Sequence, residues 1–376
     1  MPPESVQHDL ETSDLLTSWP ANAPLALLAS HGDGEFGRFS LAGSPSRMVE
    51  LSGPSTIQEL DQLLTTPAHA ASAPTGRGWI IALGYELGAR IEPAVTGYGS
   101  PESGPFWPEA TLLRCDGVLF RPSGGTWSIL GDPGAVPELA PPRDLECHAG
   151  TLRRTCSRQA YEENVAKAVE YIHAGDCFQV NLAQRMQCDF SGSVRCLAQT
   201  AFEISQPRYG AHLETGPGRA IVSMSPELFL EVNGADSQRT IRTRPIKGTL
   251  QSDANPDELL RSEKDAAELA MIVDLMRNDL GRICTPGSIA VNNPRTIETH
   301  KTIHHTTGDV SGTLQRDTSF GDLLRATFPP GSVTGAPKIR AMQIIETLEP
   351  IRRGPYCGAI GWLDDSGIYT ASKSFD

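Results

Sequence analysis

Residues 159–185 read QAYEENVAKAVEYIHAGDCFQVNLAQR, and this stretch holds a helical pattern followed by a strand pattern. In its first part, apolar side chains recur at intervals of four and three residues, at Val165, Val169 and Ile172. That spacing predicts a helix over residues 159–174. Gly175 follows as a typical helix stop.

Apolar and polar residues alternate from residue 177 to residue 185, which predicts a β-strand with two unlike faces. The apolar face would carry Phe178, Val180 and Leu182, and the polar face Gln179, Asn181 and Arg185. A strand face made of amides and a guanidinium is either a solvated sheet face or the wall of a polar site. The pattern alone leaves both interpretations open.

Outward from this stretch, the chain divides into two compositional regions. Residues 20–130 hold short apolar runs separated by Gly and Pro, which is typical of strands and turns. Residues 131–155 are rich in Pro and Gly and are the predicted linker. Beyond them helices and strands alternate. We therefore predict one region over residues 1–150 and a second over residues 151–376.

The bulk composition excludes several classes of protein. With 376 residues, 39% of them hydrophobic and 20% charged, the chain is neither disordered nor membrane-embedded. A net charge of -13 argues against nucleic acid as a partner. The eight cysteines form no CxxC pair, so we expect reduced thiols without a zinc site or a disulfide framework. The polar, acidic N-terminal segment lacks a signal-peptide pattern, so we expect a cytoplasmic protein.

Two further segments carry candidate functional groups. A helix is predicted over residues 263–280, because Leu269, Val273, Met276 and Leu280 form one apolar stripe. Glu268 borders this stripe, either as a solvated helix flank or as a metal ligand. Residues 328–338 read FPPGSVTGAPK, a turn that leads into a helix near Pro337. The backbone amides of such a turn either bind an anion or serve a structural role.

Several motifs stand in a fixed order along residues 155–370 and together resemble the chorismate-utilising family of anthranilate, aminodeoxychorismate, isochorismate and salicylate synthases. The motifs are GDCFQVNL at 175–182, SPE at 225–227, RPIKGT at 244–249, MIVDLMRND at 271–279, HH at 304–305, GSVTGAPK at 331–338 and YCG at 356–358. A fainter likeness includes Arg38-Phe39 and GYELG at 84–88.

The resemblance implies the fold and the reaction class. It implies an α+β fold like that of anthranilate synthase component I, in which large antiparallel sheets pack face to face with helices outside. Family members bind chorismate with Mg²⁺ in a cleft among these elements. The aminating members receive ammonia from a separate glutamine amidotransferase subunit, and we expect both that partner and chorismate here.

Two positions discriminate among the family's reactions. The isochorismate and salicylate synthases carry a Lys that activates water at the place of Gln179, and an amide cannot remove that proton. Lys247 stands where anthranilate synthases carry a small residue and aminodeoxychorismate synthases a Lys. Its neutral amine would attack C2 of chorismate and expel the C4 hydroxyl, after which ammonia would add at C4 and release the lysine. Alternatively, Lys247 pairs with a substrate carboxylate.

The resemblance also assigns the other site residues. His305 would be a general acid near the departing hydroxyl, whereas His304 would be structural. Glu268 would be a Mg²⁺ ligand. Lys338 would add positive charge or lie on the surface, and Pro330 replaces a Gly that is usual in the family. The expected substrate-binding residues are Gln179, Thr249, Gly331, Ser332, Thr334, Gly335 and Tyr356.

The C-terminal end departs from the family pattern. Family members continue through an Ile-Arg-Thr strand, a glycine-rich loop and a helix with two more acidic metal ligands. Here Asp376 falls where a carboxylate-binding Arg is expected. The resemblance therefore predicts a shortened chain. Three functions stay open: an aminodeoxychorismate synthase large subunit for p-aminobenzoate and folate synthesis, an anthranilate synthase component, or an inactive remnant that binds its partner.

Overall fold

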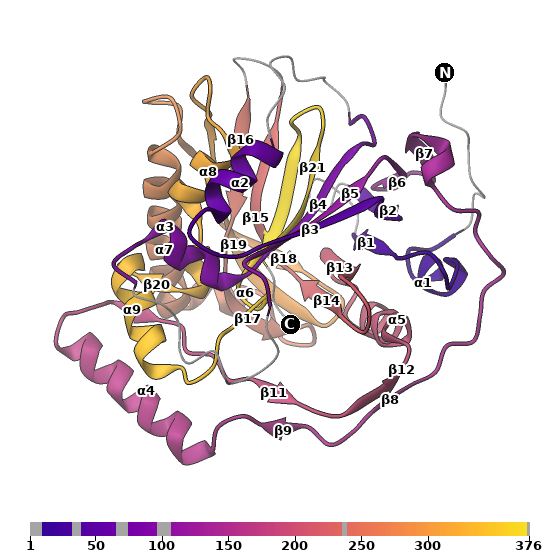
Figure 1. The fold of residues 1–376 in the computed structure, drawn as a ribbon. Coiled ribbons are helices and arrows are strands. Elements are labelled where there is room, and N and C mark those ends of the chain that lie inside the picture. Colours follow the sequence, from indigo (N-terminus) through magenta and orange to yellow (C-terminus); the bar gives the residue numbers. More distant parts are fainter. Residues whose placement is uncertain (1–9, 32–38, 65–73, 96–106, 235–238, 374–376) are drawn as a thin grey trace.

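The computed structural model describes residues 10–31, 39–64, 74–95, 107–234 and 239–373. Arg38 and Asp376, two positions singled out in the sequence, lie outside these described residues. Two antiparallel sheets dominate the fold, and helices cover their outer faces (Figure 1). The predicted α+β class with large antiparallel sheets is confirmed.

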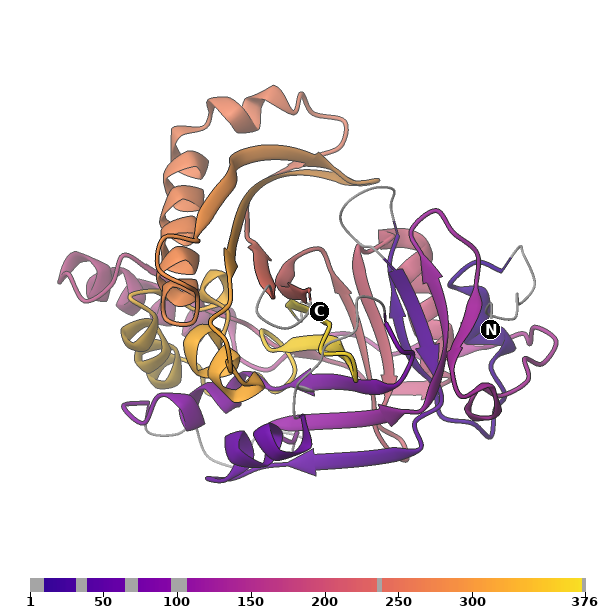
Figure 2. The same cartoon turned by 90° about the horizontal axis from the view of Figure 1, so that it is seen from above.

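The larger sheet has ten strands, all paired antiparallel. Its order is β17 (Ile246–Gln251), β19 (Ile303–Thr313), β16 (Thr240–Arg244), β15 (Leu228–Asn233), β22 (Tyr369–Lys373), β21 (Ala359–Asp364), β4 (Gly78–Leu83), β5 (Ala110–Cys115) and β3 (Arg47–Leu51), with β18 (Ala290–Thr299) also paired to β19. Figure 2 shows β18 and β19 as long, curved strands beside the helix α7 (Glu263–Gly281).

The smaller sheet has six strands. Its order is β14 (Ala220–Ser225), β13 (Tyr209–Glu214), β1 (Ala26–Ala29), β2 (Phe39–Gly43), β6 (Gly117–Pro122) and β7 (Ser128–Gly131). Both sheets thus take strands from either side of residue 150. The division that the composition predicts at this residue does not separate one sheet from the other.

Strand alternation explains how the two sheets come together. In β4, Ile80 belongs to the cluster between the sheets, and its neighbour Ile81 belongs to the cluster under the helices. The inner cluster joins Leu113, Ile360 and Trp362 of the large sheet to Leu41, Leu213 and Ile221 of the small one. Side chains two residues apart share a face, so each strand contributes side chains to two hydrophobic cores. The expected face-to-face packing is confirmed.

The helices cover the outer faces of the sheets (Figure 1). On the large sheet lie α7, α8 (Phe320–Thr327) and α2 (Thr56–Leu63), and on the small sheet lie α1 (Asp14–Ser18) and α5 (Val194–Ser205). The predicted stripe of α7 is buried, with Leu269 and Leu280 each 1% exposed. None of the described helices has the length and apolar character needed to cross a membrane.

The helix expected over residues 159–174 is α4 (Arg158–His173), which begins at the N-cap Ser157. Its apolar face is not buried against the described residues, because Val165, Val169 and Ile172 are 38%, 43% and 37% exposed. The periodicity correctly predicts a helix with an apolar side. It does not predict which part of the protein covers that side.

The continuous strand expected over residues 177–185 is wrong. Within this range only β10 (Gln179–Val180) forms, and β11 (Met186–Gln187) begins just after it. Each pairs with another two-residue strand. Those partners are β20 (Gly335–Ala336) and β9 (Arg153–Arg154). Alternation predicts which residues share a face, but a ladder extends only as far as a partner strand runs beside it. Here the partner changes after two residues.

Candidate active site

Lys247 and His305 come from neighbouring strands of the large sheet. β17 pairs antiparallel with β19, and the register sets Lys247 opposite Thr306 and Thr249 opposite His305. One extra residue, Gly248, bulges between Lys247 and Thr249 with φ +76. A bulge of this kind re-aims side chains within a sheet. Lys247 is half-buried, and within the described residues its ammonium has no hydrogen-bond or ion-pair partner.

The two adjacent histidines have different environments. His304 uses both ring nitrogens, toward Thr299 Oγ1 at 2.9 Å and the Ser252 carbonyl oxygen at 3.1 Å. His305 Nδ1 lies 2.9 Å from Thr249 Oγ1, and its buried Nε2 has no partner in the described part of the chain. Burial, and then the charge of His300, lowers the pKa of His305. His305 is therefore neutral near pH 7, with one nitrogen free for a ligand.

A buried charge cluster that the sequence did not predict lies behind His305. The ring of His300 is 5.3 Å from that of His305, and His300 faces the carboxylate of Glu298. Glu298 also pairs with Arg244 and with Arg208. Burial opposes ionisation of Glu298, but His300 and the two arginines outweigh it and lower its pKa. This network places the guanidinium groups of Arg244 and Arg208 in the same cluster as His305.

Glu227 connects the turn at residues 331–335 to the strand of Lys247. Its carboxylate accepts hydrogen bonds from Ser332 Oγ at 3.1 Å and from the Ile246 amide at 3.2 Å. Ile246 directly precedes Lys247 in β17. The SPE motif contained this glutamate, but nothing in the sequence showed which groups it would join. Ser332 and Lys247, predicted separately, are brought together through this buried side chain.

The turn itself uses several of its own polar groups. It forms a short helix, Gly331–Val333, and the hydroxyl of buried Thr334 donates to the carbonyl oxygens of Pro330 and Gly331. The amides of Val333 and Thr334 also donate within the turn. These two amides and the Thr334 hydroxyl therefore stabilise the turn. They are not available as hydrogen-bond donors to an anion.

Gln179 lies against this turn through β10. The register sets Gln179 opposite Ala336 and Val180 opposite Gly335. The Gln179 Oε1 atom is buried and has no partner in the described part of the chain. Gly335 has φ +136, and a Cβ there would lie 2.1 Å from the Gln179 carbonyl oxygen. A glycine is therefore required for the strand that carries Gln179 to dock on the turn.

Replacing Gly335 with alanine should detach β10 from β20. The added Cβ collides with backbone, and the positive φ adds strain, so we expect the free energy of unfolding to fall by about 2–4 kcal/mol. Urea denaturation followed by circular dichroism measures this. Gly287→Ala is the matched control, because Gly287 has φ +82 but nothing within 4 Å of its added Cβ. Equal losses in both variants would show that the collision is unimportant.

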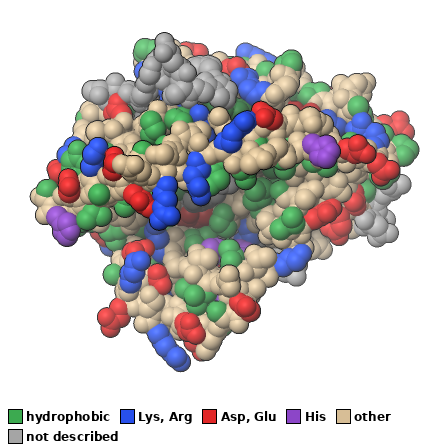
Figure 3. Space-filling view, turned by 90° about the horizontal axis from the view of Figure 1, so that it is seen from below, with side chains coloured by type: hydrophobic (Ala, Val, Ile, Leu, Met, Phe, Trp, Pro, Cys, Tyr) green, Lys and Arg blue, Asp and Glu red, His purple; other side chains and the backbone are tan. Residues whose placement is uncertain are grey.

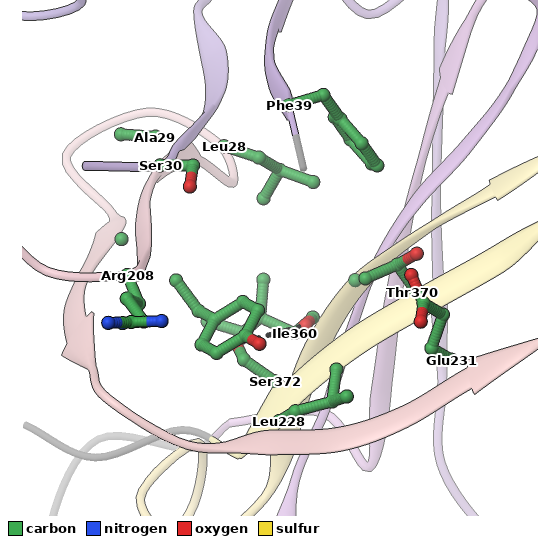
Figure 4. Close-up of a pocket in the computed structure, with 13 residues that line it drawn as sticks. Leu28, Ala29, Ser30, Phe39, Arg208, Leu228, Glu231, Ile360, Thr370 and Ser372 are labelled. Atoms are coloured by element: carbon green, nitrogen blue, oxygen red, sulfur yellow. Dashed lines mark hydrogen bonds between the residues drawn. The ribbon is translucent and has the colours of Figure 1, made fainter. Parts of the chain in front are cut away.

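The surface and the interior both contain hollows near these elements. Figure 3 shows a hollowed face with histidine, basic and acidic side chains around it. Figure 4 shows a separate pocket between the sheets, where Arg208, Glu231, Ile360 and Ser372 converge. Its volume is about 50 Å³, far below the roughly 300–1,000 Å³ of ordinary ligand pockets. The pocket in Figure 4 is therefore too small to hold a cyclic dicarboxylate.

Residues 26–372 match the family model described as chorismate binding enzyme. The chain belongs to this family. Aminodeoxychorismate synthase component 1 of Escherichia coli is 36% identical over 328 residues, which cover 82% of this chain and 70% of that protein. The namesake in Klebsiella aerogenes is 42% identical over 227 residues, covering 58% of this chain and 49% of that protein. The chain thus aligns with about half the length of the Klebsiella relative.

Other members of the family are also similar. Anthranilate synthase component 1 of Streptomyces coelicolor is 31% identical over 393 residues, covering 93% of this chain and 75% of that protein. The crystal structure of anthranilate synthase component I from Streptococcus pneumoniae superposes with a TM-score of 0.79 at 25% identity, covering 91% of this chain and 84% of that one. The fold is therefore that of anthranilate synthase component I.

Two further predicted site residues, Tyr356 and Glu268, have surroundings of their own. Tyr356 lines a cavity of about 670 Å³ with Arg352 and Met186, and burial raises its pKa. Glu268 lies on α7, and the Lys264 ammonium is 3.7 Å from its carboxylate. Among the described residues, no hydrogen bond or ion pair joins either side chain to Lys247.

The acidic groups near Glu268 bear on metal binding. No three His, Cys, Asp or Glu side chains of the described residues lie close enough together to hold a metal ion. Glu268 would thus offer a single protein carboxylate. Mg²⁺ in enzymes often takes one or two carboxylates and completes its octahedron with substrate oxygens and water. One carboxylate fits such a shared site and does not fit a cage made of protein alone.

Lys338 has a structural position. Its ammonium donates to Asp279 at 2.6 Å and to the Thr327 carbonyl oxygen at 3.0 Å, and both side chains of the ion pair are buried. Burial raises the pKa of Asp279, and Lys338 opposes that rise. The ion pair joins the start of α9 (Lys338–Leu348) to the end of α7. Lys338 is therefore neither a surface residue nor an uncompensated charge for the substrate.

Proposed function

We propose that this chain is the chorismate-aminating component of an aminodeoxychorismate synthase, which converts chorismate and ammonia to 4-amino-4-deoxychorismate. The observation that carries this proposal is Lys247, a half-buried amine without an ion-pair partner in the described residues, one register step from His305. The names of the Escherichia coli and Klebsiella aerogenes relatives support it. The product would serve p-aminobenzoate and folate synthesis.

The proposed reaction proceeds in two substitutions. The neutral Lys247 amine attacks C2 of chorismate, the ring double bond shifts, and the C4 hydroxyl leaves as water after it receives a proton. Ammonia then attacks C4 and expels the lysine from C2. Splitting one difficult displacement into two easier ones is the gain of nucleophilic catalysis. His305 would deliver this proton in its protonated form, through Nε2, which is unpartnered within the described residues.

The charge cluster supports binding of a dianion by an acidic protein. The chain carries -13 overall, and Arg244 and Arg208 bring two guanidinium groups into the cluster behind His305. Low exposure strengthens this local field, because few waters screen it. Gln179 of β10 and the turn at residues 331–335 would also contact the substrate. Thr249 would orient His305 through its hydrogen bond.

Anthranilate synthase is the alternative that the similarities favour next. The Streptomyces relative of that name aligns with more of this chain than the Escherichia coli aminodeoxychorismate synthase does. Lys247 argues against this alternative, because anthranilate synthases have a similar motif but carry a small residue at the position of Lys247. Isochorismate synthases add water to chorismate with the help of a Lys at the place of Gln179. The amide of Gln179 argues against that reaction here. Both arguments rest on single side chains and are open to direct test.

A glutaminase partner is part of the proposal. The relatives are named component 1, which implies a second component. We propose that a glutamine amidotransferase subunit supplies ammonia, and that free ammonium replaces it in the test tube.

Product analysis tests the assignment. The purified chain is incubated with chorismate, MgCl₂ and ammonium at mildly alkaline pH, and the products are separated by chromatography and identified by mass. We expect 4-amino-4-deoxychorismate, which keeps its enolpyruvyl group. Anthranilate with pyruvate, or isochorismate, would assign the chain to another branch of the family. Unconsumed chorismate would contradict the proposed activity of this chain.

Magnesium is proposed as the cofactor, with Glu268 as its protein ligand. The ion would neutralise a carboxylate of the substrate. We expect Glu268→Gln to weaken Mg²⁺ binding about tenfold or more in the presence of chorismate, as measured by calorimetric titration. Glu263→Gln is the control, since Glu263 is exposed in the first turn of the same helix. Unchanged Mg²⁺ affinity in Glu268→Gln would remove Glu268 from the metal site.

A further inference from the structure

Two cysteines from segments far apart in the chain lie side by side. Cys147 is in β8 (Cys147–Ala149), and Cys196 is in the first turn of α5. Their Sγ atoms are 2.8 Å apart. All eight cysteines of the chain are free thiols, as the sequence predicts. The site described above uses neither member of this pair.

The backbone holds the two sulfur atoms in this position. β8 pairs with β12 (Phe190–Gly192), and Cys147 is opposite Gly192. The Ser193 amide then donates to the Glu146 carbonyl oxygen at 2.9 Å. Gly192 has φ +93, and a Cβ there would lie 2.4 Å from the Glu146 oxygen. Only a glycine permits this close approach, four residues before Cys196.

The Cys147 thiol donates a hydrogen bond to the Cys196 sulfur. The hydrogen bond with Cys147 raises the pKa of Cys196. Once Cys147 has lost its proton, the Cys196 thiol can donate to the resulting thiolate, because the two sulfur atoms are 2.8 Å apart. Both side chains are half-buried, so a small oxidant reaches them from solvent. A thiolate beside a second thiol is the arrangement in which oxidation ends in a disulfide.

We propose that Cys147 and Cys196 form a dithiol that hydroperoxides oxidise reversibly to an intramolecular disulfide. The Cys147 thiolate attacks one oxygen of hydrogen peroxide and breaks the O–O bond, giving a sulfenic acid and, after proton uptake, water. The Cys196 sulfur then attacks the sulfenic sulfur, and the hydroxyl leaves as a second water with the Cys196 proton. Two electrons pass from the thiols to the peroxide. An external thiol reverses the reaction by exchange.

The bridge would close a long excursion of the chain. Residues 147–196 include α4, β10 and β11, and β10 carries Gln179 against the turn at Gly335. A disulfide that joins the two ends of such a loop restricts the unfolded chain far more than the folded one. Oxidation should therefore stabilise this segment without moving the elements that it joins.

A peptide map tests the proposal on the unmodified chain. Native protein is treated with hydrogen peroxide, digested without reductant, and analysed by mass. We expect a cross-linked peptide pair that contains Cys147 and Cys196, two hydrogens lighter than its separate parts and absent after dithiothreitol. No bridged peptide, or a bridge from either residue to a different cysteine, would overturn the proposal.

Thermal melting of variants adds a second, independent measurement. We expect peroxide to raise the melting temperature of the native chain by about 5 °C or more, and dithiothreitol to reverse the shift. Cys188→Ser should show the same shift, because Cys188 is a half-buried cysteine outside the pair. Cys147→Ser and Cys196→Ser should each show none. A peroxide-induced shift that persists in Cys196→Ser would contradict the assignment.

Discussion

Replacing Lys247 with alanine should abolish formation of aminodeoxychorismate, lowering kcat by about 10³-fold or more. An amine that forms a covalent bond to the substrate cannot be replaced by charge or by packing, so its removal restores the full barrier of the uncatalysed displacement. Steady-state kinetics with ammonium as nitrogen source measure this. Lys167→Ala on α4 is the control, because Lys167 is an exposed lysine that is not among the proposed site residues.

A second substitution separates nucleophilic catalysis from simple ion pairing. Arginine keeps the positive charge at position 247 but has no neutral amine at accessible pH. If Lys247 bonds covalently to C2, Lys247→Arg should be as inactive as Lys247→Ala. If it only pairs with a substrate carboxylate, Lys247→Arg should keep most of its activity, with the change mainly in KM.

The covalent intermediate gives a direct observation. Without ammonia, the second substitution cannot occur, so the lysine adduct of chorismate minus water should accumulate. Mass spectrometry of the intact chain and of its peptides should place this mass on Lys247 and show none in Lys247→Arg. An adduct on any other residue would remove Lys247 from this role.

Replacing Arg353 with methionine should produce the largest loss of stability. Its guanidinium is 2% exposed and pairs with Glu349 at 2.6 Å. It also donates to the carbonyl oxygens of Val333 and Asn181, and it lies 4.5 Å from the ring centre of Tyr85. Arg353 thus joins the turn at residues 331–335 to the segment after β10. Breaking a buried pair on one side leaves an uncompensated charge, at a cost of about 3–5 kcal/mol.

Thermal and urea denaturation measure this loss, and two variants define its cause. We expect the melting temperature of Arg353→Met to fall by about 5 °C. Arg158→Met should change it little, because Arg158 is 86% exposed and its pair with Glu162 lies in solvent. Adding Glu349→Leu to Arg353→Met should recover part of the stability by removing the unpaired carboxylate. A further loss of stability in the double variant would show that the unpaired Glu349 carboxylate is not the main cause of the destabilisation.

Local patterns predicted the elements whose neighbours are close in the sequence. The stripe of α7 is buried as expected, since a helix forms its own hydrogen bonds and needs only one apolar side. The same argument gave α4 its bounds within a residue. It failed for residues 177–185, where a strand depends on a partner from elsewhere in the chain. The partner, β20, is more than 150 residues away.

The motifs named candidate site residues but not their contacts. Lys247, Thr249 and His305 were proposed separately, and the register of β17 on β19 sets Thr249 opposite His305 and Lys247 opposite the adjacent Thr306. Glu227 and Arg244 stood inside quoted motifs without a role. Their function in the site depends on Ser332 and Glu298, which join them through buried hydrogen bonds and ion pairs. Such pairings follow no spacing rule, so the sequence contained no signal for them.

By itself, the sequence predicted the helices with local periodicity, the antiparallel class and the candidate residues of the site. The tertiary structure alone decided which of those groups meet. It engages Lys338 in an ion pair with Asp279, leaves Lys247 without an ion-pair partner among the described residues, and lowers the pKa of His305 by burial. The physical reason is that burial and charge pairing depend on distances through space. Those distances depend on how the two sheets pack, and the local sequence pattern does not show them.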